Sequence, residues 1–169
     1  MARAERRFVS HSPEATEALG RWLGERLGPG ALLALDGELG SGKTTFVRAL
    51  ARGLGVEGPV TSPTYALLQT YPGRLELAHF DAWMERRERS FLSEGGWEWL
   101  GADGVAVVEW AARVVDWLPA ERLAIEFAHR GAEERTLRLE VLGEGPRARA
   151  LAELLRSLPE LAGLEESRS

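Results

Sequence analysis

One segment, residues 31–44, restricts the possible folds of this chain more than any other. It opens with the apolar run Ala31–Leu35, which is typical of a strand buried on both faces. Residues Gly37–Thr44 then match the pattern G-x-x-x-x-G-K-[ST] at every defined position, and a helix is predicted from about Lys43 to Leu54. Glycines allow the backbone N–H groups of such a loop to point into one concavity, and the helix adds the positive end of its dipole. The segment therefore predicts an α/β protein with a phosphate-binding loop (P-loop).

The residues of this loop are the first candidates for contacts to a nucleoside triphosphate. The chain has a single lysine, Lys43, among its 21 basic residues, at the position where a compact ammonium reaches the β- and γ-phosphates. The hydroxyl of Thr44 is expected to ligate Mg²⁺, so Mg-ATP is the predicted ligand. The expected nucleotide contacts in the loop are Gly37, Glu38, Leu39, Gly40, Ser41, Gly42, Lys43, Thr44 and Thr45.

Two acidic residues follow predicted strands elsewhere in the chain. Asp81 ends the strand predicted at 75–80, and Glu109 ends the strand predicted at 105–108. Carboxylates at the carboxyl ends of strands in an open α/β sheet face the ligand crevice, on the same edge as the P-loop. Either residue could hold Mg²⁺ or orient the attacking water, and the sequence does not separate these roles. The hydroxyl-rich loop that begins at Thr61 is either a sensor of the γ-phosphate or an ordinary turn.

The order of the remaining elements indicates a mixed sheet covered by helices. We expect an α/β, three-layer P-loop NTPase fold, with a mostly parallel sheet, an inserted hairpin turning at Pro72-Gly73 and flanking helices. Residues 1–158 are expected to form one domain, and the tail 159–169 is expected to fray. Further strands are predicted at 8–10, 66–71, 123–127 and 136–141, and further helices at 13–27, 84–100, before Trp117 and at 146–158.

Composition excludes several classes of function. With no cysteine, the chain has no thiol nucleophile and no Cys-ligated metal site. A net charge of −5 with scattered basic residues argues against tight binding of nucleic acid by this chain alone. The longest apolar run is too short to cross a bilayer, and the first residues do not resemble a secretory signal, so a cytoplasmic location is expected. His11, His79 and His129 show no metal-ligand spacing, and the tryptophans are expected as core or interface anchors.

Missing motifs narrow the choice of enzyme. The chain has no asparagine, and its only lysine lies in the P-loop, so the guanine-reading element N-K-x-D cannot be present. No segment resembles L-S-G-G-Q, which argues against a transporter-type ATPase. A small-molecule kinase stays as one alternative, with Arg86, Arg87 and Arg89 as candidates for an arginine-bearing lid. A nucleotide-dependent assembly factor, in which slow hydrolysis times release from a partner, is the other.

The chain resembles the TsaE family over roughly residues 8–142. Four linked motifs carry the resemblance: Gly37–Thr45, Thr61-Ser62-Pro63-Thr64-Tyr65, His79-Phe80-Asp81 and Glu109-Trp110. Two departures from the family pattern are present: Asp81 is followed by Ala82-Trp83-Met84 in place of x-Y-R, and Glu109-Trp110 is followed by Ala111. The first departure removes the arginine that the family usually carries there.

The resemblance implies a magnesium–nucleotide site and a function that depends on partner proteins. It implies that Thr44, Asp81 and Glu109 form the magnesium environment, and that Thr61–Tyr65 is a mobile loop near the γ-phosphate. It also implies that Ser12 and a later arginine, Arg135 or else Arg130, lie near the nucleotide. A TsaE protein would be a weak ATPase, stimulated by TsaD and TsaB, that supports threonylcarbamoyladenosine formation in tRNA without performing the transfer. Contact with tRNA would be indirect or limited to the assembled complex.

Overall fold

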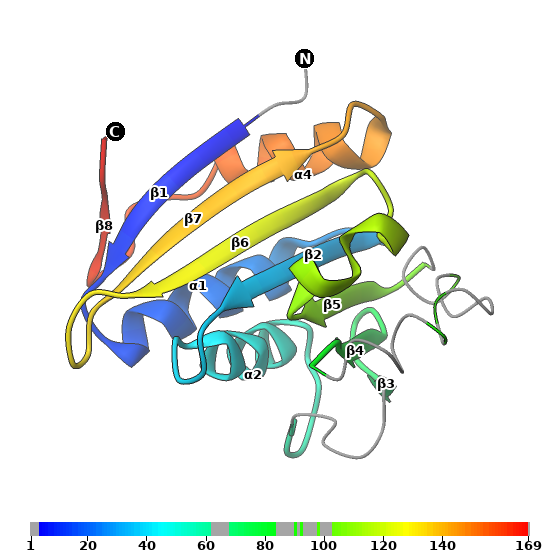
Figure 1. Ribbon diagram of the computed structural model, residues 1–169, viewed down its shortest axis with the longest axis horizontal. Helices are drawn as coiled ribbons and strands as arrows, with labels where there is room; N and C mark the ends of the chain where they lie inside the picture. Colours follow the sequence, from blue (N-terminus) through cyan, green and yellow to red (C-terminus); the bar gives the residue numbers. More distant parts are fainter. Residues whose placement is uncertain are drawn as a thin grey trace.

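The structure, a computed structural model, describes residues 4–61, 68–83, 90, 92, 98 and 103–168. Most of the helix predicted at 84–100 lies outside these residues, and the other predicted elements are present in the predicted order. In chain order (Figure 1), the elements are β1 (Ala4–Ser10), α1 (Pro13–Arg26), β2 (Ala31–Gly37), α2 (Lys43–Gly53), β3 (Leu68–Tyr71), β4 (Leu77–Asp81), β5 (Val105–Glu109), the 3₁₀ helix η2 (Ala111–Trp117), β6 (Arg122–His129), β7 (Arg135–Leu142), α4 (Pro146–Arg156) and β8 (Leu164–Glu166).

The described strands form one sheet in the order β3-β4-β5-β2-β6-β7-β1-β8. Neighbouring strands within the block β4-β5-β2-β6 are parallel. Strand β3 on one side of this block, and β7, β1 and β8 on the other, pair antiparallel. The predicted mixed sheet with an inserted hairpin is confirmed. Three of the seven pairings between the described strands are parallel, all within this block, and four are antiparallel, so parallel pairings are not the majority. The P-loop follows β2, in the middle of that block.

The two faces of the sheet are covered differently. Helices α1, α2 and α4 lie on one face, where Leu50 and Leu151 belong to the same apolar cluster as Leu33 of β2. A smaller cluster on the opposite face contains Phe80 of β4 and Val114 of η2. The predicted three-layer arrangement is therefore present over β4, β5 and β2, with η2 supplying part of the outer layer.

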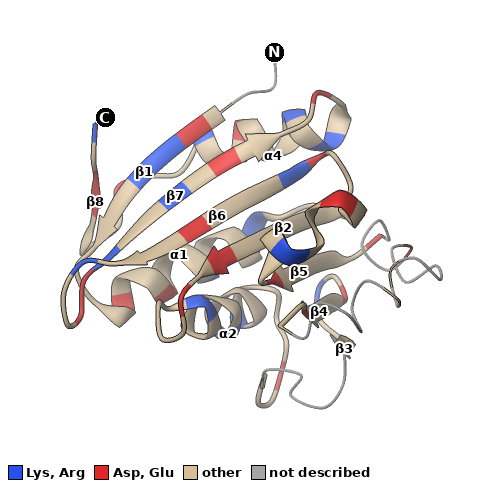
Figure 2. Ribbon diagram, viewed as in Figure 1, with Lys and Arg blue, Asp and Glu red and all other residues tan. Residues whose placement is uncertain are grey.

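Strands β6, β7 and β1 contain several charged residues (Figure 2), and in the described part of the chain no helix covers their outward face (Figure 1). Side chains alternate along a strand, so Leu139 of β7 enters the core while Arg138 and Glu140 point to the other face. Arg138 makes ion pairs with Glu140 at 2.9 Å and with Glu5 of β1 at 3.2 Å. This half of the molecule has two layers because its outer face is solvated and charged.

Close packing of α1 on α2 fixes the helix that follows the P-loop. A Cβ atom at Gly24 of α1 would lie 2.2 Å from the carbonyl oxygen of Leu50 in α2, so only glycine allows this approach. Since α2 begins at Lys43, the contact also holds the end of the P-loop in place. No helix in the described ranges has both the length and the apolar character of a membrane span.

The prediction that residues 159–169 fray is wrong for most of this tail. Residues Leu164–Glu166 form β8, which pairs antiparallel with β1. Leu164 is buried in the main core, and Arg6 of β1 donates hydrogen bonds of 2.9 and 2.8 Å to the carboxylate of Glu166. The charged tail is ordered because β1 offers it an open edge and an arginine partner, which the local sequence does not reveal.

Candidate nucleotide-binding site

The P-loop has the backbone shape that its glycines predict. Gly42, with φ of 107°, is the N-cap residue of the 11-residue helix α2, and this left-handed conformation favours glycine. A Cβ atom at Gly37 would lie 2.6 Å from the carbonyl oxygen of Phe127 in β6. The loop therefore leads from β2 into a helix N-terminus, where unpaired N–H groups and the helix dipole favour an anion.

Within the loop, one polar side chain is buried without a partner. Glu38, Leu39 and Gly40 are exposed, whereas Ser41 is buried. The Ser41 hydroxyl has no hydrogen-bond partner among the described residues. Because buried hydroxyls are nearly always satisfied in folded proteins, this group fits a loop whose function is to receive an oxygen-rich ligand. The expected contacts of these residues and of Thr45 with a nucleotide stay predictions.

Lys43 lies inside the loop and is only 5% exposed. Its ammonium donates a hydrogen bond to the carbonyl oxygen of Gly37. Its Nζ atom also lies 3.3 Å from the centroid of the Trp110 ring, close enough for a cation–π interaction. A phosphate group that enters the loop would therefore compete with a carbonyl oxygen and an aromatic face for the same ammonium.

Three carboxylates influence the charge of this ammonium. Burial lowers the pKa of Lys43, and the negative charges of Glu109, Asp36 and Asp81 oppose that shift. The net direction is downward, so burial outweighs the three acids. A low-dielectric environment strengthens any interaction that Lys43 makes with a phosphate.

Asp81 and Glu109 lie side by side at the carboxyl edge of the sheet. In the register of the sheet, Asp81 is opposite Glu109, and Glu109 is opposite Leu35 at the end of β2. Val107 belongs to the apolar cluster that α2 covers, so Glu109, two positions later on the same strand, points toward the same face. The structure thus brings both predicted acids to the side of the sheet where α2 begins with Lys43 and Thr44.

A third acid, Asp36, was not among the predicted site residues. It alternates with Leu35 and therefore points to the opposite face, where its Oδ1 accepts a hydrogen bond of 2.9 Å from the backbone N–H of Ala112 in η2. Burial raises the pKa of Asp36 and of Asp81. The position of Asp36 between a buried strand and the first glycine of the P-loop is a sequence signal that would have found it.

Glu109 is held by a buried histidine. Its Oε2 atom lies 2.6 Å from Nε2 of His79 on β4, and the two residues are 3% and 1% exposed. The other ring nitrogen, Nδ1, has no hydrogen-bond partner among the described residues. His79 shows no metal-ligand spacing in the sequence, and it lies in the core, in contact with a predicted site residue.

Trp110 packs against the smaller apolar cluster, as expected of a tryptophan that anchors the core, and its ring also contacts Lys43 in the candidate site. Its φ of 59° is the one positive value for a non-glycine residue in the described part of the chain. The ring packs edge-on against Trp83 with centroids 4.7 Å apart, and the guanidinium of Arg113 lies 5.0 Å from its centroid. Sequence reasoning missed the contacts of Trp110 and Arg113 because nothing in the local pattern reports the turn at the end of β5.

The more distant predicted residues have local structural contacts. The Ser12 hydroxyl caps α1 by accepting a hydrogen bond of 3.2 Å from the N–H of Ala15. Arg135 donates at 3.2 Å to the carbonyl oxygen of Gly40, which ties the β6–β7 hairpin to the P-loop. Arg130 is exposed in that hairpin. Proximity of Ser12, Arg135 and Arg130 to a nucleotide stays a prediction.

The loop that begins at Thr61 is described only at its first residue. Thr61 is exposed, and its carbonyl oxygen accepts a hydrogen bond of 3.3 Å from the hydroxyl of Tyr71. Residues 62–65 of the predicted mobile loop lie outside the described residues, as do Arg86, Arg87 and Arg89, the candidate lid of a kinase.

The donor set suits magnesium better than a softer metal. The predicted ligands, Thr44, Asp81 and Glu109, offer only oxygen atoms, which are the donors that Mg²⁺ prefers. No three His, Asp or Glu side chains among the described residues form a ready metal cluster. Because Mg²⁺ is commonly held by one or two carboxylates together with phosphate oxygens and water, the residues fit a metal that binds together with a nucleotide.

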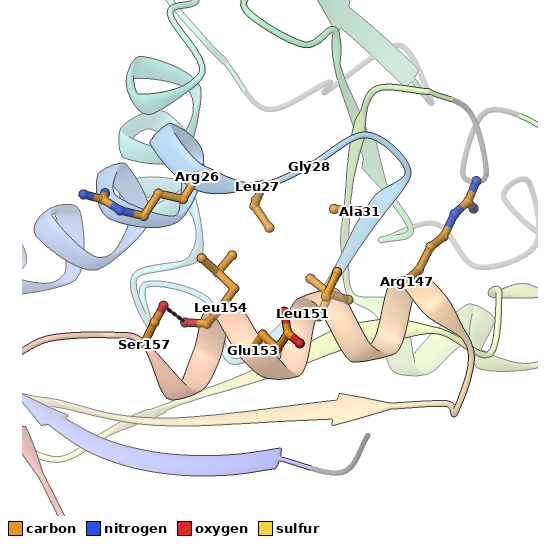
Figure 3. Close-up of a pocket in the computed structure, with 10 residues that line it drawn as sticks. Arg26, Leu27, Gly28, Ala31, Arg147, Leu151, Glu153, Leu154 and Ser157 are labelled. Carbon is orange, nitrogen blue, oxygen red and sulfur yellow. Dashed lines mark hydrogen bonds between the residues drawn. The ribbon is translucent and has the colours of Figure 1, made fainter. Parts of the chain in front are cut away.

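A separate cavity of about 450 Å³ lies at the other end of β2, between the end of α1 and helix α4 (Figure 3). Leu27, Ala31, Leu151 and Leu154 form much of its lining. The seven residues of β2 separate it from the P-loop by about 20 Å. The cavity is therefore not part of the candidate nucleotide site.

Comparison with known proteins identifies the family. The family model described as "Threonylcarbamoyl adenosine biosynthesis protein TsaE" matches residues 10–137. The protein named tRNA threonylcarbamoyladenosine biosynthesis protein TsaE from Treponema pallidum is 40% identical over 121 residues, which cover 72% of this chain and 90% of that protein. The protein of the same name from Bacillus subtilis is 38% identical over 133 residues, which cover 78% and 83% of the two chains.

A solved structure has a similar fold. The crystal structure of Bacillus subtilis YdiB matches with a TM-score of 0.76 and 31% sequence identity, over 91% of this chain and 96% of that one. The match supports the P-loop NTPase-like α/β fold. Since the family model spans the P-loop and both acidic strand ends, the chain belongs to the TsaE family.

Proposed function

We propose that this chain is a Mg²⁺-dependent, ATP-binding accessory ATPase that supports threonylcarbamoyladenosine modification of tRNA together with TsaB and TsaD. The observation that carries the proposal is the meeting of the P-loop residues Lys43 and Thr44 with Asp81 and Glu109 at one edge of the sheet. The names of the relatives support the pathway. The two partners follow from the family resemblance.

The site residues would divide the chemistry among them. Backbone N–H groups of the P-loop and the ammonium of Lys43 would bind the β- and γ-phosphates. Thr44, with Asp81 or Glu109, would hold Mg²⁺, which neutralises charge on the phosphates and fixes their geometry. The carboxylate that is not bound to the metal would orient the attacking water, and the Thr61 loop would contact the γ-phosphate.

The remaining predicted residues have supporting roles in this proposal. Arg135, which donates to the carbonyl oxygen of Gly40, would hold the P-loop against the β6–β7 hairpin, and Ser12 would lie near the nucleotide. The net charge of −5 supports indirect rather than direct contact with tRNA. The chain would act in the cytoplasm as a weak ATPase and would not itself transfer the threonylcarbamoyl group.

The test is Mg-ATP hydrolysis by the purified chain, alone and with TsaB and TsaD. We expect slow release of phosphate that rises when both partners are added. The variant Lys43→Ala should lose this activity. The matched control is Arg52→Ala, which removes a cation from the same helix at an exposed position and should behave like the wild-type chain.

Two results would contradict the proposal. One is hydrolysis that neither responds to the partners nor depends on Lys43. The other is rapid transfer of phosphate to a small acceptor, which would identify a P-loop kinase instead.

A further inference from the structure

The buried pair of His79 and Glu109 joins two neighbouring parallel strands at the candidate site. His79 lies on β4 and Glu109 on β5, and their side chains meet at 2.6 Å on the face of the sheet that α2 covers. Side chains of Leu77 on β4 and Val107 on β5 occupy the same face and belong to the apolar core. His79 is thus a polar residue in a row that is otherwise apolar up to the site.

The hydrogen bonds of His79 indicate what this residue is for. Nε2 contacts Glu109, whereas Nδ1 is buried and has no partner among the described residues. A buried polar atom without a partner destabilises the fold, so an aliphatic side chain would pack better at this position. The hydrogen bond to Glu109 is therefore the contact that favours an imidazole at this position.

The contact restricts the carboxylate of Glu109. With Oε2 bonded to the ring, rotation of the carboxylate is restricted, and this contact does not occupy Oε1. Groups that hold a metal-binding or catalytic carboxylate in this way act through its orientation, and their removal commonly lowers metal affinity or activity 10- to 100-fold.

We propose that His79 is a positioning residue that orients the Glu109 carboxylate toward the Mg²⁺–nucleotide complex. The proposal rests on the proposed function, since it requires that the P-loop bind a nucleotide. It assigns to His79 a role that does not depend on contact with the nucleotide itself.

Two substitutions of similar polarity separate positioning from general packing. In His79→Gln, the amide nitrogen can occupy the place of Nε2 and keep the bond to Glu109. In His79→Asn, the shorter side chain places its amide near Nδ1 and cannot reach Glu109. Leu77→Val is the matched control, because it perturbs the same strand and face at a fully buried position without touching Glu109.

The readouts are Mn²⁺ binding measured by electron paramagnetic resonance in the presence of ATPγS, ATPγS binding in EDTA, and kcat for ATP hydrolysis. We expect His79→Asn to weaken Mn²⁺ binding or to lower kcat by about 10- to 100-fold. Affinity for ATPγS in EDTA should stay within about twofold of the wild-type value, because Glu109 contacts the metal or the water rather than the loop. His79→Gln and Leu77→Val should behave like the wild-type chain.

Each outcome has one meaning. A loss of Mn²⁺ affinity in His79→Asn supports positioning of a metal ligand, and a loss of kcat alone supports positioning of a water-orienting group. Equal values for His79→Asn and His79→Gln, or an equal loss in Leu77→Val, would overturn the proposal. If the wild-type chain itself fails to bind ATPγS, the proposed function fails instead.

Discussion

Charged side chains lie in different environments in the antiparallel half of the sheet, which contains β7, β1 and β8, and in the parallel half, which contains β4, β5 and β2. In the antiparallel half, Glu5 is exposed, and hydrogen bonds from Arg138 and Arg7 lower the pKa of its carboxyl group to about 2. In the parallel half, burial raises the pKa of Asp81 and lowers that of Lys43. The charged form is therefore favoured at Glu5 and disfavoured at Asp81 and Lys43.

This difference identifies the edge next to the P-loop as the part of the sheet where local structure is unfavourable for stability. Partners and solvent satisfy the charges over β6, β7 and β1, whereas the edge next to the P-loop keeps buried polar atoms on Ser41 and His79 without partners in the described chain. It also holds Trp110 in a backbone conformation that bulky residues rarely adopt. Such groups collect at functional sites, so the comparison can be tested by substitutions in each half.

The largest effect on stability is expected in the antiparallel half. Leu139 of β7 is fully buried in the main core, and Leu139→Ala should lower the free energy of unfolding by about 2–5 kcal/mol. Urea denaturation measures this loss. The folded variant should bind ATPγS like the wild-type chain, and a large drop in its affinity would contradict the separation of the two halves.

The next largest effect is expected at the P-loop and should fall on binding. If the proposed function holds, Lys43→Ala removes a charge-assisted hydrogen bond to phosphate, a loss of about 1.5–3 kcal/mol, so calorimetry should report roughly 10- to 100-fold weaker binding of ATPγS. The free energy of unfolding should change less than in Leu139→Ala, because burial already disfavours the ammonium. A loss of stability as large as that of Leu139→Ala would contradict the expected difference between the two halves of the sheet.

A smaller difference in stability is expected between two substitutions at Trp110. This difference reports the backbone strain at Trp110 separately from the packing of its ring. Trp110→Ala and Trp110→Gly both lose the contacts with Lys43 and Trp83, but only glycine adopts a φ near 59° without a steric penalty. We expect the glycine variant to be more stable than the alanine variant by about 1 kcal/mol, measured by urea denaturation. Equal stabilities would show that the turn after β5 relaxes once the ring is gone.

The sequence was sufficient for those features that depend on local pattern. The P-loop could be predicted because strand, glycines, lysine and helix are contiguous. The acidic strand ends Asp81 and Glu109 could be placed because carboxyl ends of parallel strands share one edge. Both predictions need only short stretches of chain and one general rule about sheets.

The features that escaped prediction depend on contacts between distant residues. Arg6 and Glu166 are 160 positions apart, so the order of the tail could not be read from its own composition. The bond between His79 and Glu109 depends on the register of β4 against β5, and the contact of Trp110 with Lys43 depends on the turn after β5. These are tertiary properties, and the most informative site contacts are among them.

The smallest effect concerns a histidine at the margin of the antiparallel half. His11 follows β1, and its Nε2 lies 2.9 Å from Glu165 in β8 while its Nδ1 lies 3.0 Å from Glu134 in the β6–β7 hairpin. The hydrogen bond to Glu165 is the main cause that raises the pKa of His11, and Glu134 adds to it. The ring thereby links three segments when it is protonated.

Because the folded-state pKa of His11 is raised, its contribution to stability should be fully present below the ordinary pKa of about 6.5. It should be lost as the pH rises through the higher folded-state value. The difference in Tm between the wild-type chain and His11→Gln should therefore be largest at about pH 5.5 and should shrink at alkaline pH. Since both carboxylates are solvent-exposed, the difference should also decrease as salt is added. A gap in Tm that is constant across the pH range would mean that the ring stabilises β8 by packing rather than by charge.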